Sequence, residues 1–143
     1  MYPSFARAAV TVLLALPLVA CGKNGKVDQC NAFIDRANIS QAVVELLKFD
    51  GDAQQLEEEA KKVDNEVQWV KGVALTDATL VKFRADYAAN LERLAASIRE
   101  LAKAHGSDEK TADLLKKIAD GADSPLQAQS KLVDDVNGYC GAR

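Results

Sequence analysis

Few side chains in this sequence have the chemistry or the spacing of a catalytic or metal site. The chain contains one histidine, His105, and no Glu-x-x-His pair of the kind that holds di-iron centres in helical bundles. The Cys-x-x-Cys-His motif that attaches a c-type haem is absent as well. His105 directly precedes Gly106 at an expected helix end, where an imidazole commonly interacts with the helix dipole. The sequence therefore argues against an enzyme and identifies no catalytic residue, metal ligand or cofactor.

Cys21 stands out among the three cysteines because of the residues before it. It ends the stretch Leu18-Val19-Ala20-Cys21 and follows an apolar run from Ala8 to Val19, with Arg7 ahead of that run. A short basic start, an apolar segment and small residues at its end are the layout of a secretory signal. The run is shorter than the roughly 20 residues that span a bilayer as a helix. We therefore expect the N-terminal segment to direct export.

The four residues from Leu18 to Cys21 resemble the lipobox of bacterial lipoproteins, whose signal peptidase cleaves before a lipid-modified cysteine. The resemblance implies a signal peptide at residues 1–20 and lipidation at Cys21. It also implies an exported protein that is anchored to a bacterial membrane and faces the periplasm or the cell surface. Gly22 replaces the aspartate that keeps some enteric lipoproteins in the inner membrane, so the analogy favours the outer membrane. The alternative is an ordinary secretory signal with a cysteine near its cleavage site.

The composition of the chain after this signal limits the possible partners. Removal of residues 1–20 leaves 17 of the 18 basic residues and all 21 acidic residues, a formal charge of −4. Neither sign dominates, so the composition does not support a nucleic-acid partner. The remaining length has room for one domain. Gly22 to Lys26 is polar and contains glycine, so we expect a lipidated tether at residues 21–26 and a domain at residues 27–143.

Apolar residues within this domain recur at steps of three and four, the period of a helix. The pattern predicts four helices, joined by turns at Asp50-Gly51-Asp52 and between Gly72 and Asp77. Their expected ranges are Val27 to about Phe49, Asp52 to about Gly72, Thr76 or Asp77 to about His105, and Ser107 to about Gly138. The last helix is expected to be interrupted near Gly121 to Pro125 and to restart with Ser124 as N-cap.

The second predicted helix has the most regular pattern. Asp52 and Gln55 have the spacing of a capping box at its start. Its apolar stripe alternates steps of three and four over three heptads, as expected for a helix that faces one partner surface: Ala53, Leu56, Ala60, Val63, Val67, Val70 and Ala74. Glu57 and Glu58 are spaced to pair with Lys61 and Lys62 across one turn. We interpret these charges, with Glu59, as a solvent-facing outer side.

Four helices with short connections predict an all-α fold, arranged as an antiparallel up-down-up-down four-helix bundle. If Cys21 carries lipid, Cys30 and Cys140 are the remaining cysteines, and in an oxidising exported setting we expect a disulfide between them. Two free buried thiols are the alternative. The predicted topology brings the start of the first helix and the end of the last helix together. Because Cys30 and Cys140 occupy those two places, topology and cysteine spacing agree.

Five of the six aromatic residues after the signal fall in the half of this bundle nearest the lipid. They are Phe33, Trp69, Phe83, Tyr87 and Tyr139. A core that is bulkier at one end explains this clustering, and a pocket or contact surface for an apolar ligand or the membrane interface is the functional alternative. On the second interpretation, Trp69, Phe83, Tyr87 and Tyr139 are candidate partner or ligand contacts.

Trp69 differs from the other aromatic residues because it lies off the apolar stripe of its helix, one residue before Val70. A tryptophan at this position either folds back over a neighbouring helix or is exposed as an anchor for a partner. The sequence leaves both arrangements open.

These features predict a lipid-anchored helical-bundle protein of the cell envelope that acts as a binding or structural interaction module. Its partner is expected to be an envelope protein or another envelope component. An alternative is a carrier or sensor that binds a small apolar ligand in the bundle core, in a cavity lined by Phe83 and Tyr87. A second alternative is an envelope hydrolase whose catalytic residues the sequence does not identify.

Overall fold

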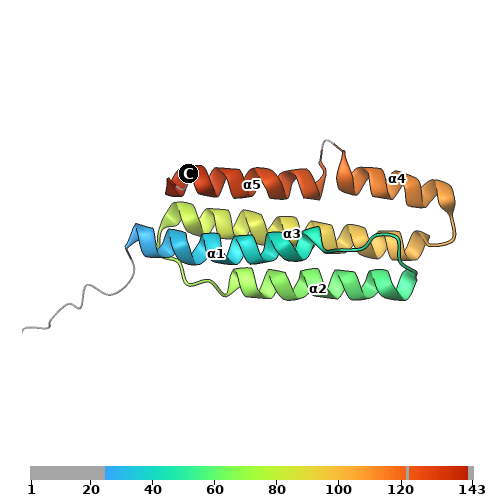
Figure 1. Cartoon of the computed structure of the whole chain (residues 1–143), viewed down its shortest axis with the longest axis horizontal. Helices are drawn as coiled ribbons and strands as arrows, with labels where there is room; N and C mark the ends of the chain where they lie inside the picture. Colours follow the sequence, from blue (N-terminus) through green and yellow to red (C-terminus); the bar gives the residue numbers. More distant parts are fainter. Residues whose placement is uncertain (1–24, 122, 142–143) are drawn as a thin grey trace, which may run out of the picture.

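The computed structural model describes residues 25–121 and 123–141, and this part of the chain is all-helical. Cys21, the predicted signal peptide and residues 21–24 of the predicted tether lie outside the described residues. The five helices are α1 (Lys26–Glu45), α2 (Ala53–Lys71), α3 (Ala78–Ala104), α4 (Asp108–Ala119) and α5 (Pro125–Cys140). Figure 1 shows α1, α2 and α3 side by side, with α4 and α5 following one another along a further side. The predicted all-α class is confirmed for the described residues.

Four helix ends gather at one end of the molecule. Figure 1 shows that α1 and α3 begin there and that α2 and α5 end there. The Sγ atoms of Cys30 and Cys140 are 2.09 Å apart and their Cα atoms 5.7 Å apart, which is disulfide distance. We call this the disulfide end. The opposite end contains the segment from Leu46 to Asp52 and the turn between α3 and α4.

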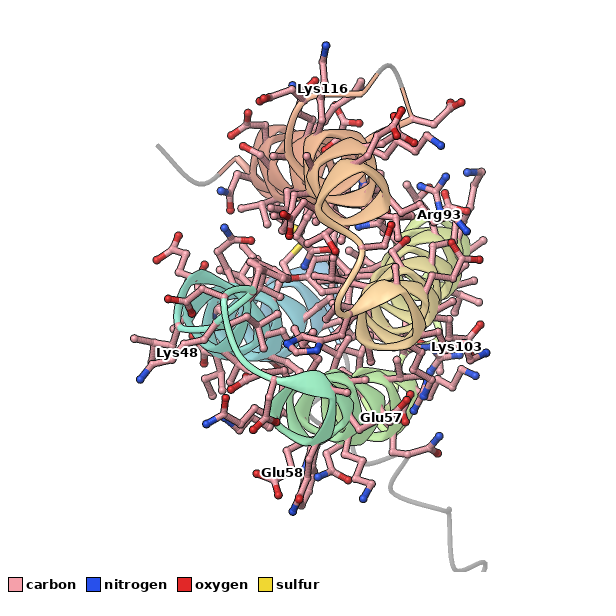
Figure 2. All side chains as sticks on the ribbon, turned by 90° about the vertical axis from the view of Figure 1, so that its right-hand side faces the viewer. Lys48, Glu57, Glu58, Arg93, Lys103 and Lys116 are labelled. Carbon is pink, nitrogen blue, oxygen red and sulfur yellow. A yellow bond between two sulfur atoms is a disulfide. The ribbon has the colours of Figure 1, made fainter. Side chains whose placement is uncertain are left out.

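The predicted apolar stripes form the core between the helices. On α2, the buried stripe residues are Leu56, Ala60, Val63, Val67 and Val70. On α3, they are Leu80, Tyr87, Leu91, Leu94, Ile98 and Leu101. Ala53 and Ala74, the ends of the predicted α2 stripe, are exposed: Ala53 is the first residue of the helix, and Ala74 lies beyond its end at Lys71. In the end-on view of Figure 2, side chains fill the space between the helices and the labelled charged residues lie around the outside.

The predicted end of the first helix is wrong by four residues. α1 ends at Glu45, and the chain from Leu46 to Asp52 continues without helix. At 20 residues, α1 is shorter than α3, which has 27. An extended chain covers about 3.3 Å per residue, against 1.5 Å in a helix, so this short segment can reach the start of α2. On the way, Leu47 is buried and Phe49 packs against the core.

The predicted helix starts are largely confirmed by the capping contacts. Asp52 and Gln55 form the capping box of α2, and Asp77 accepts hydrogen bonds from two backbone N–H groups at the start of α3. Ser124 caps α5, with Pro125 at its first turn. The predicted end of the last helix at Gly138 is wrong, because α5 continues to Cys140. Gly141, at φ 71°, takes the left-handed conformation that ends a helix.

A buried polar network fixes α5 against α3. The Asn90 side-chain amide donates to the backbone oxygen of Pro125 and to Oε1 of Gln129, both at 2.9 Å. Arg93 in turn donates to Oδ1 of Asn90 at 2.8 Å. Buried amides are costly to leave without partners, so this network selects one register of α5 along α3.

Candidate functional site

Tyr87, one of the predicted contacts, is a core residue. Its ring is fully buried and meets Phe33 edge to face, with the ring centroids 6.0 Å apart. Its hydroxyl donates to the backbone oxygen of Ala37 at 2.9 Å. Burial raises the pKa of Tyr87, so the hydroxyl remains protonated and available as a donor. Side chains thus fill this part of the bundle.

Phe83 and Tyr139 meet near the disulfide end. Their ring centroids are 5.9 Å apart, and both residues are half-buried. The Tyr139 hydroxyl lies 3.1 Å from each carboxylate oxygen of Asp77, and Nζ of Lys26 lies 3.8 Å from the centroid of the Tyr139 ring. Hydrogen bonds to the backbone N–H of Leu80 and to Tyr139 hold the pKa of Asp77 below its usual range. These contacts join the starts of α1 and α3 to the end of α5.

Trp69 is the predicted contact that the structure leaves exposed. It lies on the last turn of α2, and 63% of its surface is accessible to solvent. Ile39 of α1, which is 52% exposed, borders the same groove. The groove has a volume of about 510 Å³ and runs between α1 and the end of α2. Its lining is Ala32, Asp35, Arg36, Ile39, Trp69, Gly72, Val73 and Ala74. We call this the Trp69 groove.

Arg36 forms one wall of the Trp69 groove and is held by two neighbours. Its guanidinium carbon lies 5.8 Å from the centroid of the Trp69 ring, a cation–π distance. The same guanidinium forms an ion pair with Glu66 of α2, which also accepts a hydrogen bond of 2.7 Å from Ser40. Both members of the ion pair are largely buried, and burial lowers the pKa of Arg36. Because the Arg36 cation is paired with Glu66 and mostly buried, it lines the groove in a fixed position and is not available to pair with a ligand.

The α1 side of this groove was not predicted from the sequence. Ala32 and Ile39 are seven residues apart, and Leu46 follows at the same interval. Residues seven apart lie on nearly the same side of a helix, and Ile39 and Leu46 are both exposed. This second apolar row was a usable signal. It was missed because the core-facing apolar residues of the same helix, Cys30, Phe33, Ala37 and Val44, form a more obvious stripe.

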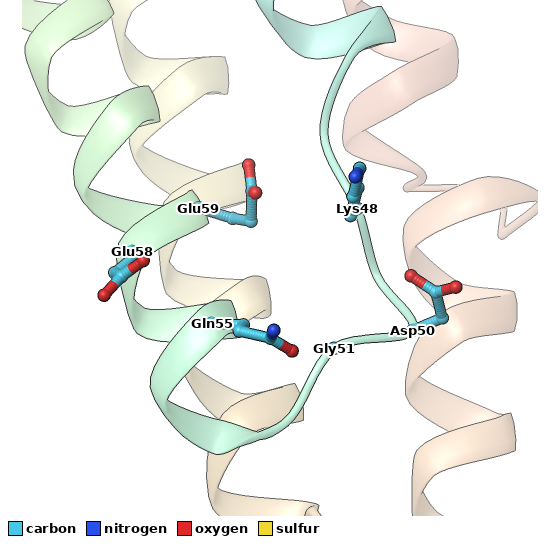
Figure 3. A pocket seen from close by; sticks show the side chains of 6 residues that line it. All are labelled: Lys48, Asp50, Gly51, Gln55, Glu58 and Glu59. Atoms are coloured by element: carbon cyan, nitrogen blue, oxygen red, sulfur yellow. The ribbon is translucent and has the colours of Figure 1, made fainter.

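A second cavity, at the opposite end, is polar. It has a volume of about 450 Å³ and is lined by Lys48, Asp50, Gly51, Gln55, Glu58 and Glu59. Figure 3 shows it between α2 and the segment that carries Lys48 and Asp50. The interpretation of Glu59 as solvent-facing is wrong, because the residue is only 7% exposed. One oxygen of Glu59 pairs with Lys62, and the other is buried without a partner among the described residues.

The other predicted charge pairs of α2 also differ from the structure. Oε2 of Glu57 lies 3.7 Å from Nε of Arg99 in α3, and Lys62 pairs with Glu59 rather than Glu58.

The polar cavity is lined by charges of both signs, and one of its carboxylates, that of Glu59, is already paired with Lys62. Within residues 25–121 and 123–141, no three His, Cys, Asp or Glu side chains gather as a metal site would require. We regard the Trp69 groove as the better candidate.

Replacement of Trp69 by alanine should change the free energy of unfolding by about 1 kcal/mol or less, because the exposed ring has only its contact with Arg36 and the groove to lose. Denaturant unfolding of the wild type and of Trp69→Ala measures this directly. A loss of about 3–5 kcal/mol, the cost of truncating a core aromatic ring, would contradict the exposed placement. Since Trp69 is the single tryptophan, its emission in the folded protein should also be quenched readily by iodide.

Two further findings bear on the function. None of the helices in the described part of the chain is long and apolar enough to span a membrane. The chain matches no protein family model, no curated protein and no solved structure.

Proposed function

We propose that the protein is a lipid-anchored module of the cell envelope that works by binding an envelope protein or another envelope component through the Trp69 groove. The observation that carries this proposal is the exposure of Trp69 beside Ile39 over an apolar groove. Tryptophan and arginine are the residues most often found as energetic anchors of interfaces. Here both border one groove, and Arg36 is already held in place by Glu66.

The proposed anchor is a lipid on Cys21, after removal of a signal peptide at residues 1–20. Residues 21–26 then form a tether to the domain at residues 27–143, and the outer membrane is favoured over the inner. Two features of the described residues support this. α1 begins at Lys26, the last residue of the proposed tether, with no side-chain cap, so the proposed domain boundary agrees with the helix start to within one residue. It begins at the disulfide end, so a tether of this length would hold that end nearest the lipid.

The proposed topology is an antiparallel up-down-up-down four-helix bundle in which α4 and α5 together act as the fourth helix. Their lengths support this, because the 12 residues of α4 and the 16 of α5 together match the 27 of α3. The gathering of two helix starts and two helix ends at the disulfide end also supports it. The interruption near Gly121 to Pro125 is then a break within the fourth helix of the bundle.

A photocrosslinking residue placed at position 69 tests the binding proposal in intact cells. We expect it to capture a specific envelope component, identified by mass spectrometry as a protein or a lipid. The matched control has the same crosslinker in place of Ser130, an exposed residue of α5. α5 does not contact α2 in the described part of the molecule, so position 130 reports a different face. Identical products from both positions, or none from position 69, would contradict a specific role of the Trp69 groove.

A further inference from the structure

Most of the exposed large apolar residues of the described chain lie on one side of the molecule. Among the described residues, the full set is Val27, Ile39, Leu46 and Trp69. The first two belong to α1, Leu46 directly follows it, and Trp69 belongs to α2. Single exposed apolar residues are ordinary on a protein surface, but here α3, α4 and α5 contribute none of this set. This uneven distribution indicates that the α1 and α2 side of the molecule contacts something other than water.

The apolar face extends along α1. Ala32, Ile39 and Leu46 repeat every seven residues and so share one side, over a length of about 21 Å at the rise of an α-helix. Val27 points elsewhere, because twelve residues of helix turn it about 120° away from Ile39. Trp69 adjoins the row through the groove that it shares with Ala32 and Ile39. We call these four residues, Ala32, Ile39, Leu46 and Trp69, the Trp69 face.

We propose that the Trp69 face lies on the lipid surface to which the chain is tethered, with the Trp69 ring in the interfacial layer. This inference rests on the proposed lipidation of Cys21 and names the envelope component that the groove contacts. Tryptophan combines a large apolar ring with one N–H donor, and for this reason it concentrates at membrane–water interfaces. An open apolar groove beside it provides further contact with lipid.

The length of the chain between the lipid and the helix favours this occupant. Cys21 precedes Gly25 by four residues, a span of at most about 14 Å. The start of α1 would therefore be held close to the membrane, and the Trp69 face begins two turns further along the same helix. A bundle on so short a tether can lie on its side, with α1 and α2 toward the lipid. A protein partner would have to enter this narrow space.

The charges around the face indicate apolar rather than electrostatic contact with lipid. Asp35 lines the groove as an acidic group, and the charge of Arg36 is already paired with Glu66. The residues that line the groove therefore include no free basic cluster that would bind anionic headgroups. We expect docking on zwitterionic lipid and little dependence on salt, since screening weakens charge pairs but not burial of apolar surface.

The native protein, isolated with its own N-terminus and reconstituted into vesicles of phosphatidylethanolamine and phosphatidylcholine, tests this placement. The phosphatidylcholine is brominated high on its acyl chains, so that it quenches a tryptophan in the interfacial layer. We expect the emission of Trp69 to shift to the blue and to lose most of its intensity, equally at low and high salt. The control is the double variant Trp69→Phe and Ser130→Trp, whose tryptophan on α5 should retain its emission.

Mass spectrometry of the same sample separates the two proposals. If Cys21 carries acyl chains but Trp69 is not quenched by the brominated lipid, the docking is refuted and the anchor stands. If the mature chain carries no acyl chain, both are overturned. A blue shift that needs no vesicles and grows with protein concentration would identify a second copy of the chain as the occupant and would also refute docking on lipid.

Discussion

Removal of the bond between Cys30 and Cys140 is expected to lower the free energy of unfolding by about 4–5 kcal/mol. The bond joins cysteines 110 residues apart, so it restricts the conformations of most of the unfolded chain. In the chain-entropy model, long loops give the largest stabilisation. Because small domains are stable by only about 5–15 kcal/mol, the bond accounts for a large share of the total.

The double variant Cys30→Ala/Cys140→Ala is the better test, because a single replacement leaves a free thiol that could join two chains. Urea unfolding of this variant should show the loss, while circular dichroism shows that the helices persist, since the buried stripes of α2 and α3 remain. Addition of a reductant should destabilise the wild type and leave the double variant unchanged. Two reactive thiols in the denatured, unreduced protein, after allowance for Cys21, would contradict a bond in the native protein.

Replacement of Cys21 by serine is expected to abolish lipid attachment completely. A hydroxyl cannot take the place of the thiol that the lipobox resemblance requires, so the precursor should accumulate with residues 1–20 still attached. Mass spectrometry of the intact chain measures both effects, as the absence of acyl mass and the presence of the signal. The matched control is Cys30→Ala/Cys140→Ala, which should be processed and acylated as usual. A native protein with a mature N-terminus and no lipid would refute the anchor.

The parts of the fold that could be predicted are those set by local sequence. The stripes of α2 and α3 are periodic, and the side chains of Asp52 and Ser124 cap helices through contacts within three residues. Such features depend on the neighbouring chain alone, so a single sequence reveals them. The same holds for the interruption before Pro125.

The parts that could not be predicted depend on contacts between distant segments. α1 has a second apolar row on its outer side, and its pattern did not show where the helix ends or that the outer row lines a groove. Glu59 is buried although it lies off the apolar stripe of α2, because other parts of the chain pack beside it, which no periodicity within α2 indicates. The placement of Trp69 was left open for the same reason, since its exposure depends on how α1 packs beside the end of α2. Of the groove residues, Trp69 was therefore predicted as a candidate contact, whereas Ala32 and Ile39 were not.

The bond at the disulfide end also determines how the chain responds to tension. A force applied between the two ends of the polypeptide enters at Cys30 and leaves at Cys140, whose Cα atoms are 5.7 Å apart. The chain between them, a sequence separation of 110 residues, is bypassed, which removes roughly 370 Å of possible extension at about 3.4 Å per residue. Pulling on the termini therefore leaves the helices between Cys30 and Cys140 folded, and only the first turn of α1, before Cys30, can unravel. A load on the N-terminal segment is transmitted to α1 and α5 together, and the molecule behaves as a short, inextensible link.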